Sequence, residues 1–239
     1  MKYLDLTLPT PAENLAMDEA LLDACEAGLG GETLVFWEPR ETFVVVGYAN
    51  HVDREVNVAR CETRGIPIFR RCSGGGTVVQ MPGGLNYSLL LPIAAEGPTG
   101  TITSANQHIM ERTRRALAAA AGLPVEVRGH TDLAVGEKKF AGNSQRRRRD
   151  WLLFHGTILL QGNLDLIGEL LPMPSLEPDY RQQRSHRDFV MNLPLAAGDV
   201  KAALRAEWQA GDPLSPPPLA EIARLAREKY ATEGWNRKF

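Results

Sequence analysis

Three shortages limit what this chain of 239 residues can be. It has only three cysteines, an odd number without metal-ligand spacing, which favours a reducing compartment over a disulfide framework. No apolar run reaches the length of a membrane-spanning helix, and residues 1–5 lack the apolar core of a signal peptide, so the cytoplasm is the expected location. The formal net charge of −2 and the pI near 6.2 argue against bulk binding to nucleic acid.

The composition that remains is that of an ordinary globular protein, with 44% hydrophobic and 23% charged residues. Strand and helix patterns are mixed without strict alternation, which predicts an α+β fold with a mixed sheet flanked by helices. We find no internal repeat and no linker rich in glycine or serine, so residues 1–239 are interpreted as a single domain.

Periodicity and end signals predict the individual elements. Helices are expected over residues 13–27, 52–64, 104–121, 164–171, 200–210 and 219–230, and strands over 2–8, 33–37, 42–47, 66–70, 85–91, 125–128, 132–135 and 151–160. Asp53 and Ser104 are the expected N-caps, and Gly65 and Gly122 the expected terminators. Segment 172–194 is expected to be irregular.

A glycine-rich stretch stands out from ordinary packing. After an apolar run the chain reads Arg70, Arg71, Cys72, Ser73, Gly74, Gly75, Gly76 and Thr77. Three consecutive glycines imply backbone that bends sharply or approaches another group closely. Free N–H groups beside arginines suit a phosphate or a carboxylate. A glycine-rich hairpin with two solvated arginines fits these residues equally well.

Lys139 is the second feature of interest. It follows a turn and precedes the small-residue segment Phe140, Ala141, Gly142, Asn143 and Ser144. Small residues let a ligand lie close to the backbone, and a lysine ammonium suits a phosphate or a developing oxyanion. The alternative is a solvated lysine at a hairpin tip.

Two further motifs have both an ordinary and a functional interpretation. His155, Gly156 and Thr157 interrupt an apolar strand, where the glycine indicates a bulge or a close backbone approach. The run from Arg146 to Arg149 is interpreted as a solvated loop, with docking of an acidic partner as the alternative. Cys72 is interpreted as a buried hydrophobe, although arginines beside a thiol favour a nucleophile.

Taken in order, these motifs resemble the lipoate–protein ligase A family, within the biotin/lipoate ligase and octanoyltransferase superfamily. The family patterns Arg-Arg-x-Ser-Gly-Gly-Gly-x-Val, Lys-x-(Ser/Ala)-Gly and His-Gly-(Thr/Ser) match residues 70–78, 139–142 and 155–157. Weaker similarities occur at residues 14–19, 47–50, 57, 86, 131–133 and 233–236. Three separate motifs in order are far more specific than any one of them.

The resemblance implies the catalytic domain of a ligase, in which ATP activates lipoate as lipoyl-AMP and a lysine of an acceptor lipoyl domain then attacks. Lys139 would be catalytic, Arg70 would hold the anionic end of the nucleotide, and Asp132 would assist Mg²⁺. The implied substrate and nucleotide contacts are Arg70, Arg71, Ser73, Gly74, Gly75, Gly76, Thr77, Asn86, Asp132, Phe140, Ala141, Gly142, Ser144, His155, Gly156 and Thr157.

Three departures from the family pattern keep other functions open. Gln80 stands where many members carry histidine. The chain stops soon after Asn236, so a separate accessory-domain protein is an implied partner. Octanoyltransferase relatives use a cysteine acyl intermediate, and no cysteine follows Cys72, which weakens the alternative of an octanoyl- or lipoyl-transferase using an acyl carrier or preformed acyl-AMP. A family member without turnover is a third possibility, and the retained Lys139 argues against it.

Overall fold

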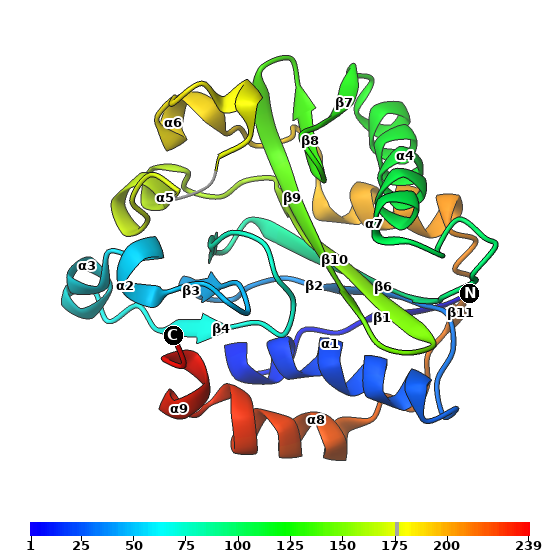
Figure 1. Cartoon of the computed structure of the whole chain (residues 1–239). Helices are drawn as coiled ribbons and strands as arrows, with labels where there is room; N and C mark the ends of the chain where they lie inside the picture. Colours follow the sequence, from blue (N-terminus) through cyan, green and yellow to red (C-terminus); the bar gives the residue numbers. More distant parts are fainter. Residues whose placement is uncertain (175–176) are drawn as a thin grey trace.

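The computed structural model describes residues 1–174 and 177–239, and within these residues the strands form two sheets (Figure 1). The larger sheet consists, in spatial order, of β11 (Asp212–Pro213), β1 (Lys2–Asp5), β2 (Thr33–Trp37), β6 (Gly84–Pro92), β10 (Trp151–Leu159), β9 (Lys138–Arg147), β8 (Asp132–Val135) and β7 (Val125–Arg128). The smaller sheet consists of β4 (Ile68–Arg70), β3 (Phe43–Val46) and β5 (Val78–Gln80). Both sheets mix parallel and antiparallel pairs, so the predicted α+β fold is confirmed.

Helices cover both faces of the larger sheet, which explains why β2 is buried along its whole length. In β2, Leu34 and Phe36 pack into the core beneath α4 (Ile102–Ala121) and α7 (Ala197–Glu207). The alternate residues, Val35 and Trp37, pack with α1 (Pro11–Glu26) and α8 (Leu219–Leu225). Successive side chains of a strand point to opposite faces, so one continuous apolar run serves two cores.

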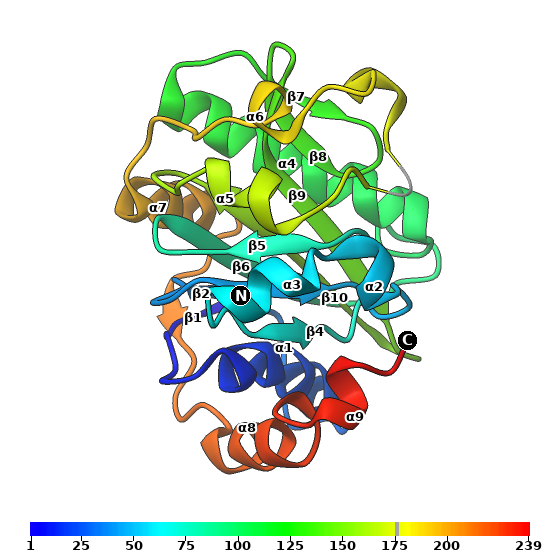
Figure 2. The same cartoon turned by 90° about the vertical axis from the view of Figure 1, so that its left-hand side faces the viewer.

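The smaller sheet carries a third core on its outer side (Figure 2). It is covered by α2 (Val52–Glu55), α3 (Val58–Thr63), α5 (Asp165–Leu170) and α6 (His186–Phe189). Val44 and Val46 of β3 face these helices, while Phe43 and Val45 face the core shared with α1. The two sheets therefore lie side by side with helices outside both.

The predicted helix over residues 52–64 is wrong as a single element. Val56 adopts an extended conformation (φ −135°, ψ 136°), and the Asn57 side chain then caps α3 by accepting a backbone N–H. Asparagine is a strong N-cap, so a second helix begins where one continuous helix was expected. Asp53 is not the cap of α2, which begins after His51 without a side-chain cap.

Two helices begin earlier than predicted because capping boxes extend them. Thr10 caps α1 and bonds reciprocally with Glu13, and a proline occupies the first helical position. Thr101 caps α4 in the same way, with Ser104 at the third helical position rather than at the cap. Gly122 ends α4 in the left-handed conformation (φ 63°), as expected.

The C-terminal half contains short elements that the sequence did not predict. The segment expected to be irregular contains α6 and the turn Asp179–Arg181, while residues 175 and 176 lie outside the described part. Helix α8 continues into a π-turn (Ala226–Tyr230), and α9 (Glu233–Asn236) follows it. None of the helices that the structure describes combines the length and the apolar character needed to cross a bilayer.

Candidate active site

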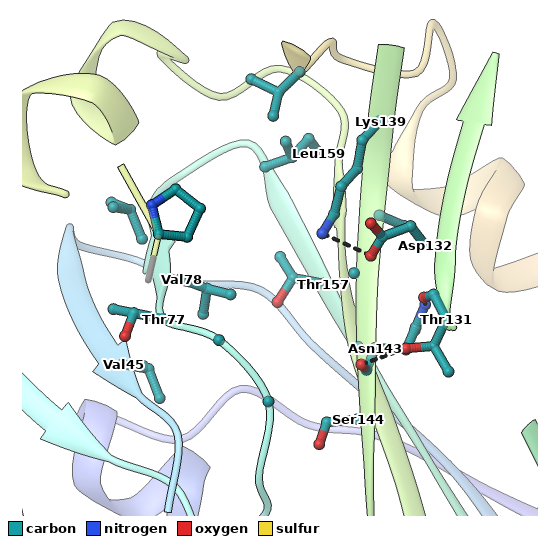
Figure 3. A pocket seen from close by; sticks show the side chains of 18 of the residues that line it. Val45, Thr77, Val78, Thr131, Asp132, Lys139, Asn143, Ser144, Thr157 and Leu159 are labelled. Carbon is teal, nitrogen blue, oxygen red and sulfur yellow. Dashed lines mark hydrogen bonds and ion pairs between the residues drawn. The ribbon is translucent and has the colours of Figure 1, made fainter. Parts of the chain in front are cut away.

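A cavity of about 1010 Å³ is lined by the central strands β6, β9 and β10 together with residues 75–80, which lead into β5. This volume lies at the upper end of the range usual for small-molecule sites. Figure 3 shows Val45, Val78 and Leu159 along its walls, with Lys139 and Asp132 on one side. The cavity therefore offers both apolar surface and charged groups.

The glycine loop, residues 73–77, is held by its carbonyl groups. Arg71 Nη2 donates to Gly74 O (2.5 Å) and Gly76 O (2.7 Å), and Ser144 Oγ donates to Gly74 O (2.9 Å). The backbone N–H groups of residues 74–77 donate to no group in the described chain. Carbonyls are thus occupied while amides stay free, an arrangement that suits an anion.

Two positions in and beside this loop require glycine. Gly75 has φ +84°, a left-handed conformation that disfavours residues with a side chain. A Cβ atom added to Gly47 would lie 2.1 Å from Gly75 O, so the loop can pass only against a residue without a side chain. The glycines thus allow both the sharp bend and the close backbone approach expected from the sequence.

Arg71 supplies a buried positive charge to the cavity wall. It is 8% exposed, and none of the ion pairs among the described residues involves it. Burial lowers the pKa of its guanidinium to about 10, so the group stays protonated at neutral pH. A buried cation without a carboxylate partner favours an anionic ligand.

Arg70 has a different place, which corrects the expectation that it holds the nucleotide. It is fully buried and does not line the cavity. Its Nη1 donates to the carbonyls of Gly47 (2.9 Å), Tyr48 (3.1 Å) and Asn50 (2.8 Å). Other donors reach carbonyls of the C-terminal segment, residues 235–239. Arg70 ties chain segments together and has no donor left for a ligand.

Lys139 projects into the cavity from β9 (Figure 3). Its Nζ lies 2.7 Å from Asp132 Oδ1, and Asp132 Oδ2 accepts a hydrogen bond from the Tyr180 hydroxyl (2.8 Å). Burial, with the nearby Asp132 charge, raises the pKa of Tyr180, so its hydroxyl remains a donor. The Lys139 side chain is 28% exposed, which leaves the ammonium accessible to a ligand.

Asp132 does not present a ready site for Mg²⁺. Each of its oxygens already accepts from a side chain, and no group of three acidic, histidine or cysteine residues in the described ranges could hold a metal ion. The partners of Asp132 therefore fit an ion pair with Lys139 better than a site for Mg²⁺.

Gly142 makes room for Lys139, which yields a prediction. A Cβ atom on Gly142 would lie 2.9 Å from Lys139 Nζ and 3.0 Å from its Cε. If Lys139 has the catalytic role that the family resemblance implies, Gly142→Ala should displace the ammonium and lower turnover by about 100-fold, because misplacing a catalytic group by 1 Å costs that much. Steady-state rates of the acylation that this resemblance implies measure the loss.

The matched control is Gly198→Ala in α7, where an added Cβ would meet nothing within 4 Å. We expect it to keep full activity and to be as stable as the wild type or slightly more so. A Gly142→Ala enzyme with wild-type turnover would show that the position of the Lys139 ammonium does not limit the reaction.

Three polar side chains of the cavity wall satisfy one another. Gln80 Nε2 donates to Asn86 Oδ1 (2.8 Å) and to Thr157 Oγ1 (2.8 Å), and Asn86 Nδ2 donates back to Gln80 Oε1 (2.9 Å). Gln80, where the family pattern breaks, is therefore part of a closed amide pair in the wall.

Strand β10 runs through residues 155–157 without a bulge, so the expected bulge is wrong. The expected close approach is correct, because a Cβ on Gly156 would lie 1.8 Å from Asn143 Oδ1. That oxygen accepts from Tyr87 Oη (2.7 Å), while Asn143 Nδ2 donates to Thr131 O (2.7 Å) (Figure 3). Gly156 thus leaves space for the half-buried Asn143 side chain, which links β9 to β6 and to the residue that precedes β8.

The arginine run is not the expected solvated loop. β9 extends to Arg147, and three of the four side chains are half-buried and bonded. Arg146 Nη1 donates to Cys72 O (2.6 Å), Arg147 Nη2 to Thr99 O (2.9 Å), and Arg148 Nη2 to Asp23 Oδ1 (2.7 Å). These residues fix neighbouring loops to the sheet, and only Arg149 is exposed.

The structure brings most of the predicted site residues to one cavity. Those lining it are Arg71, Gly75, Gly76, Thr77, Asn86, Asp132, Lys139, Phe140, Ala141, Gly142, Ser144, His155, Gly156 and Thr157. Arg70, Ser73 and Gly74 do not line the cavity.

Two residues that line the cavity, Asp18 and Tyr180, were not predicted from the sequence. Asp18 lay within the weakly family-like segment 14–19, whereas nothing in the sequence marked Tyr180.

Comparison with known proteins places the chain in a family. The sequence pattern of the lipoyl protein ligase A/B catalytic domain matches residues 10–206, so the chain belongs to that family, whose members named below are enzymes. It is 30% identical over 269 residues to the octanoyltransferase LipM of Exiguobacterium sibiricum, covering 95% of each chain.

Solved structures agree on the fold. A bi-partite lipoate protein ligase from Thermoplasma acidophilum superposes with a TM-score of 0.83 at 24% identity, covering 99% of this chain and 95% of the other. A lipoate-protein ligase A bound with ATP superposes with a TM-score of 0.80 at 25% identity, covering 99% of each chain. Solved structures of lipoate protein ligases thus share this architecture, and the relative named as an octanoyltransferase matches in sequence.

Proposed function

We propose that this protein is an ATP-dependent lipoate–protein ligase, which joins lipoate or a related medium-chain acid to a lysine of an acceptor lipoyl domain through an acyl-adenylate. One observation carries the proposal: a single cavity combines the buried Arg71, the accessible Lys139 and a glycine loop with free amides. Such a site suits a carboxylate and a phosphate that must be held together. The ATP-bound relative of the same fold supports the choice of nucleotide.

In the first step a carboxylate oxygen of the acid attacks the α-phosphorus of ATP, and pyrophosphate leaves. The Lys139 ammonium is placed to neutralise the carboxylate and the α-phosphate as they approach, while Asp132 fixes its direction. The free amides of the glycine loop and the Arg71 charge stabilise the remaining negative oxygens. Apolar walls at Val45, Val78 and Leu159 suit the acyl chain.

In the second step the amine of the acceptor lysine attacks the acyl carbonyl, an amide bond forms and AMP leaves. The positive charge of Lys139 stabilises the oxygens of the breaking anhydride. No residue of this chain forms a covalent intermediate in this scheme.

The alternative of a transferase that takes its acyl group from an acyl carrier through a cysteine intermediate requires a thiol that this cavity does not provide. Cys25, Cys61 and Cys72 are all buried, and none lines the cavity. Burial raises the pKa of Cys72 to about 12, so its thiol is protonated at neutral pH and is a poor nucleophile. This observation favours the ligase, although relatives at similar identity are named octanoyltransferases.

We propose two protein partners. The acceptor is a lipoyl domain, and a separate accessory-domain protein assists activation, as the bi-partite architecture of the relative from Thermoplasma acidophilum suggests. The relative's lipoyl domain belongs to an E2 protein, which gives a starting choice for the acceptor.

The decisive experiment follows pyrophosphate release from ATP and lipoate, with and without an acceptor domain. If the protein is a ligase, pyrophosphate release should depend on lipoate, and the mass of the acceptor domain should increase by that of a lipoyl group. Transfer only from synthetic lipoyl-AMP would show that the accessory protein is required. Transfer from octanoyl carrier protein without ATP would replace the ligase with the transferase.

A further inference from the structure

A chain of buried hydrogen bonds runs beneath the glycine loop to helix α1. Arg71 Nε donates to Ser73 Oγ (3.0 Å), which lies 2.5 Å from His155 Nε2, and His155 Nδ1 lies 2.6 Å from Asp18 Oδ2. The Ser88 hydroxyl donates to Asp18 Oδ1 (2.6 Å). We call these five side chains the Ser73 relay.

The donors and acceptors of the relay form one consistent set. The Asp18 carboxylate accepts from His155 Nδ1–H, so Nε2 is left to accept from the Ser73 hydroxyl. That hydroxyl oxygen in turn accepts from Arg71 Nε. Every connection is satisfied, and a buried network of this kind fixes the rotamer of each member.

The spacing matches that of a serine, histidine and aspartate catalytic triad, yet two observations disfavour a nucleophilic serine. Ser73 is 1% exposed and does not line the cavity, so a substrate carbonyl does not reach its oxygen. The Ser73 oxygen also accepts a hydrogen bond from the Arg71 guanidinium. This bond engages a lone pair of the oxygen and makes it a weaker nucleophile toward a carbonyl carbon. The relay therefore positions the Ser73 side chain and takes no part in bond formation.

Ser73 is where the glycine loop begins, and the loop has few other anchors. Ser73 O accepts from Tyr48 N (2.8 Å), and among the residues that the structure describes only Arg71 and Ser144 form further hydrogen bonds to the loop before β5 begins at Val78. Loss of the Ser73 side-chain contact removes the link between the loop and β10.

We propose that Asp18 and His155 are positioning residues that hold Ser73, and through it the glycine loop, in the conformation that binds the carboxylate and the phosphate. Asp18 comes from α1 and His155 from β10, 137 positions further along the chain, so two distant elements set the shape of the loop. The catalytic part of this inference rests on the proposed ligase function.

The test is a double-mutant cycle with Ser73→Ala, His155→Ala and the double variant, together with Asp18→Asn. In an assay of lipoate-dependent pyrophosphate release, each single variant should lower kcat/KM by about 100-fold. The double variant should lower it no further, because both residues act through one contact.

His155→Gln should recover much of the loss, since its amide still reaches Ser73. His51→Gln, on an exposed histidine outside the cavity, is the matched control and should be unchanged.

A second readout does not depend on activity. Hydrogen exchange of the Tyr48 amide, which bonds Ser73 O, should accelerate in His155→Ala and not in His51→Gln. This result separates the two proposals. A wild-type chain that neither releases pyrophosphate nor transfers lipoate from lipoyl-AMP removes the ligase, whereas unchanged Tyr48 exchange removes the relay.

Two other outcomes overturn the relay. Independent, multiplying losses in the double variant would show that Ser73 and His155 do not act through one contact. Mass spectrometry that finds an acyl group on Ser73 after reaction with an acyl thioester would make Ser73 the nucleophile and His155 its base.

Discussion

Lys139→Ala should abolish protein lipoylation, with kcat/KM reduced about 1000-fold or more, while the fold stays intact. Removing one preorganised neutral donor at a developing charge costs roughly 100- to 1000-fold, and Lys139 donates with a full positive charge. The side chain is 28% exposed and its ion pair with Asp132 is partly solvated, so its loss costs little stability. Transfer of lipoate to an acceptor domain measures the rate, and circular dichroism with thermal unfolding checks the fold.

Lys138→Ala is the matched control. Lys138 is the exposed neighbour on the same strand, and its side chain does not line the cavity. We expect wild-type rates from it, which would show that the loss is specific to Lys139 and does not follow from removing any lysine of β9. Wild-type lipoylation by Lys139→Ala would remove Lys139 from the mechanism.

Arg70→Ala should lower the free energy of unfolding, in contrast to Lys139→Ala, which should lower the rate. The fully buried guanidinium is the donor for carbonyls of residues 47, 48, 50, 235 and 236. Each buried carbonyl left without a donor costs roughly 1–3 kcal/mol, so we expect a loss of at least about 4 kcal/mol. For a chain of this size that lowers Tm by about 10 °C or more.

Denaturant unfolding of Arg70→Ala and Arg70→Met measures the loss, and Arg187→Ala serves as the control. Arg187 is exposed and its ion pair with Asp165 spans 3.7 Å, so its removal should change stability by less than about 0.5 kcal/mol. An Arg70→Ala protein as stable as wild type but deficient in ATP binding would restore the nucleotide-binding role first expected for Arg70.

Local sequence signals located the elements well and their ends less well. Apolar runs and terminating glycines gave β2, β6, β10 and the end of α4, because burial on both faces and left-handed backbone each leave a strong signature. The predicted starts of α1 and α4 were wrong, because the capping boxes that begin at Thr10 and Thr101, three residues before the predicted starts, were not recognised. The interpretation of residues 1–239 as a single domain stays a prediction.

The site shows the same division between local and distant information. Lys139, the glycine loop and residues 155–157 were predicted, because each motif combines residue types that are costly in ordinary packing. Asp18 and Tyr180 were missed because neither belongs to a local motif, and each joins the site only by meeting a side chain 137 or 48 positions away.

By itself the sequence determined that this is an α+β protein, and it marked the glycine loop and Lys139 as candidate site residues, since composition and short motifs depend on neighbours along the chain. Only the tertiary structure decided which of two adjacent arginines serves the cavity. Arg70 and Arg71 are indistinguishable as residue types, but they follow one another at the end of a strand, where successive side chains point to opposite sides. One therefore lies among backbone carbonyls and the other faces the ligand cavity.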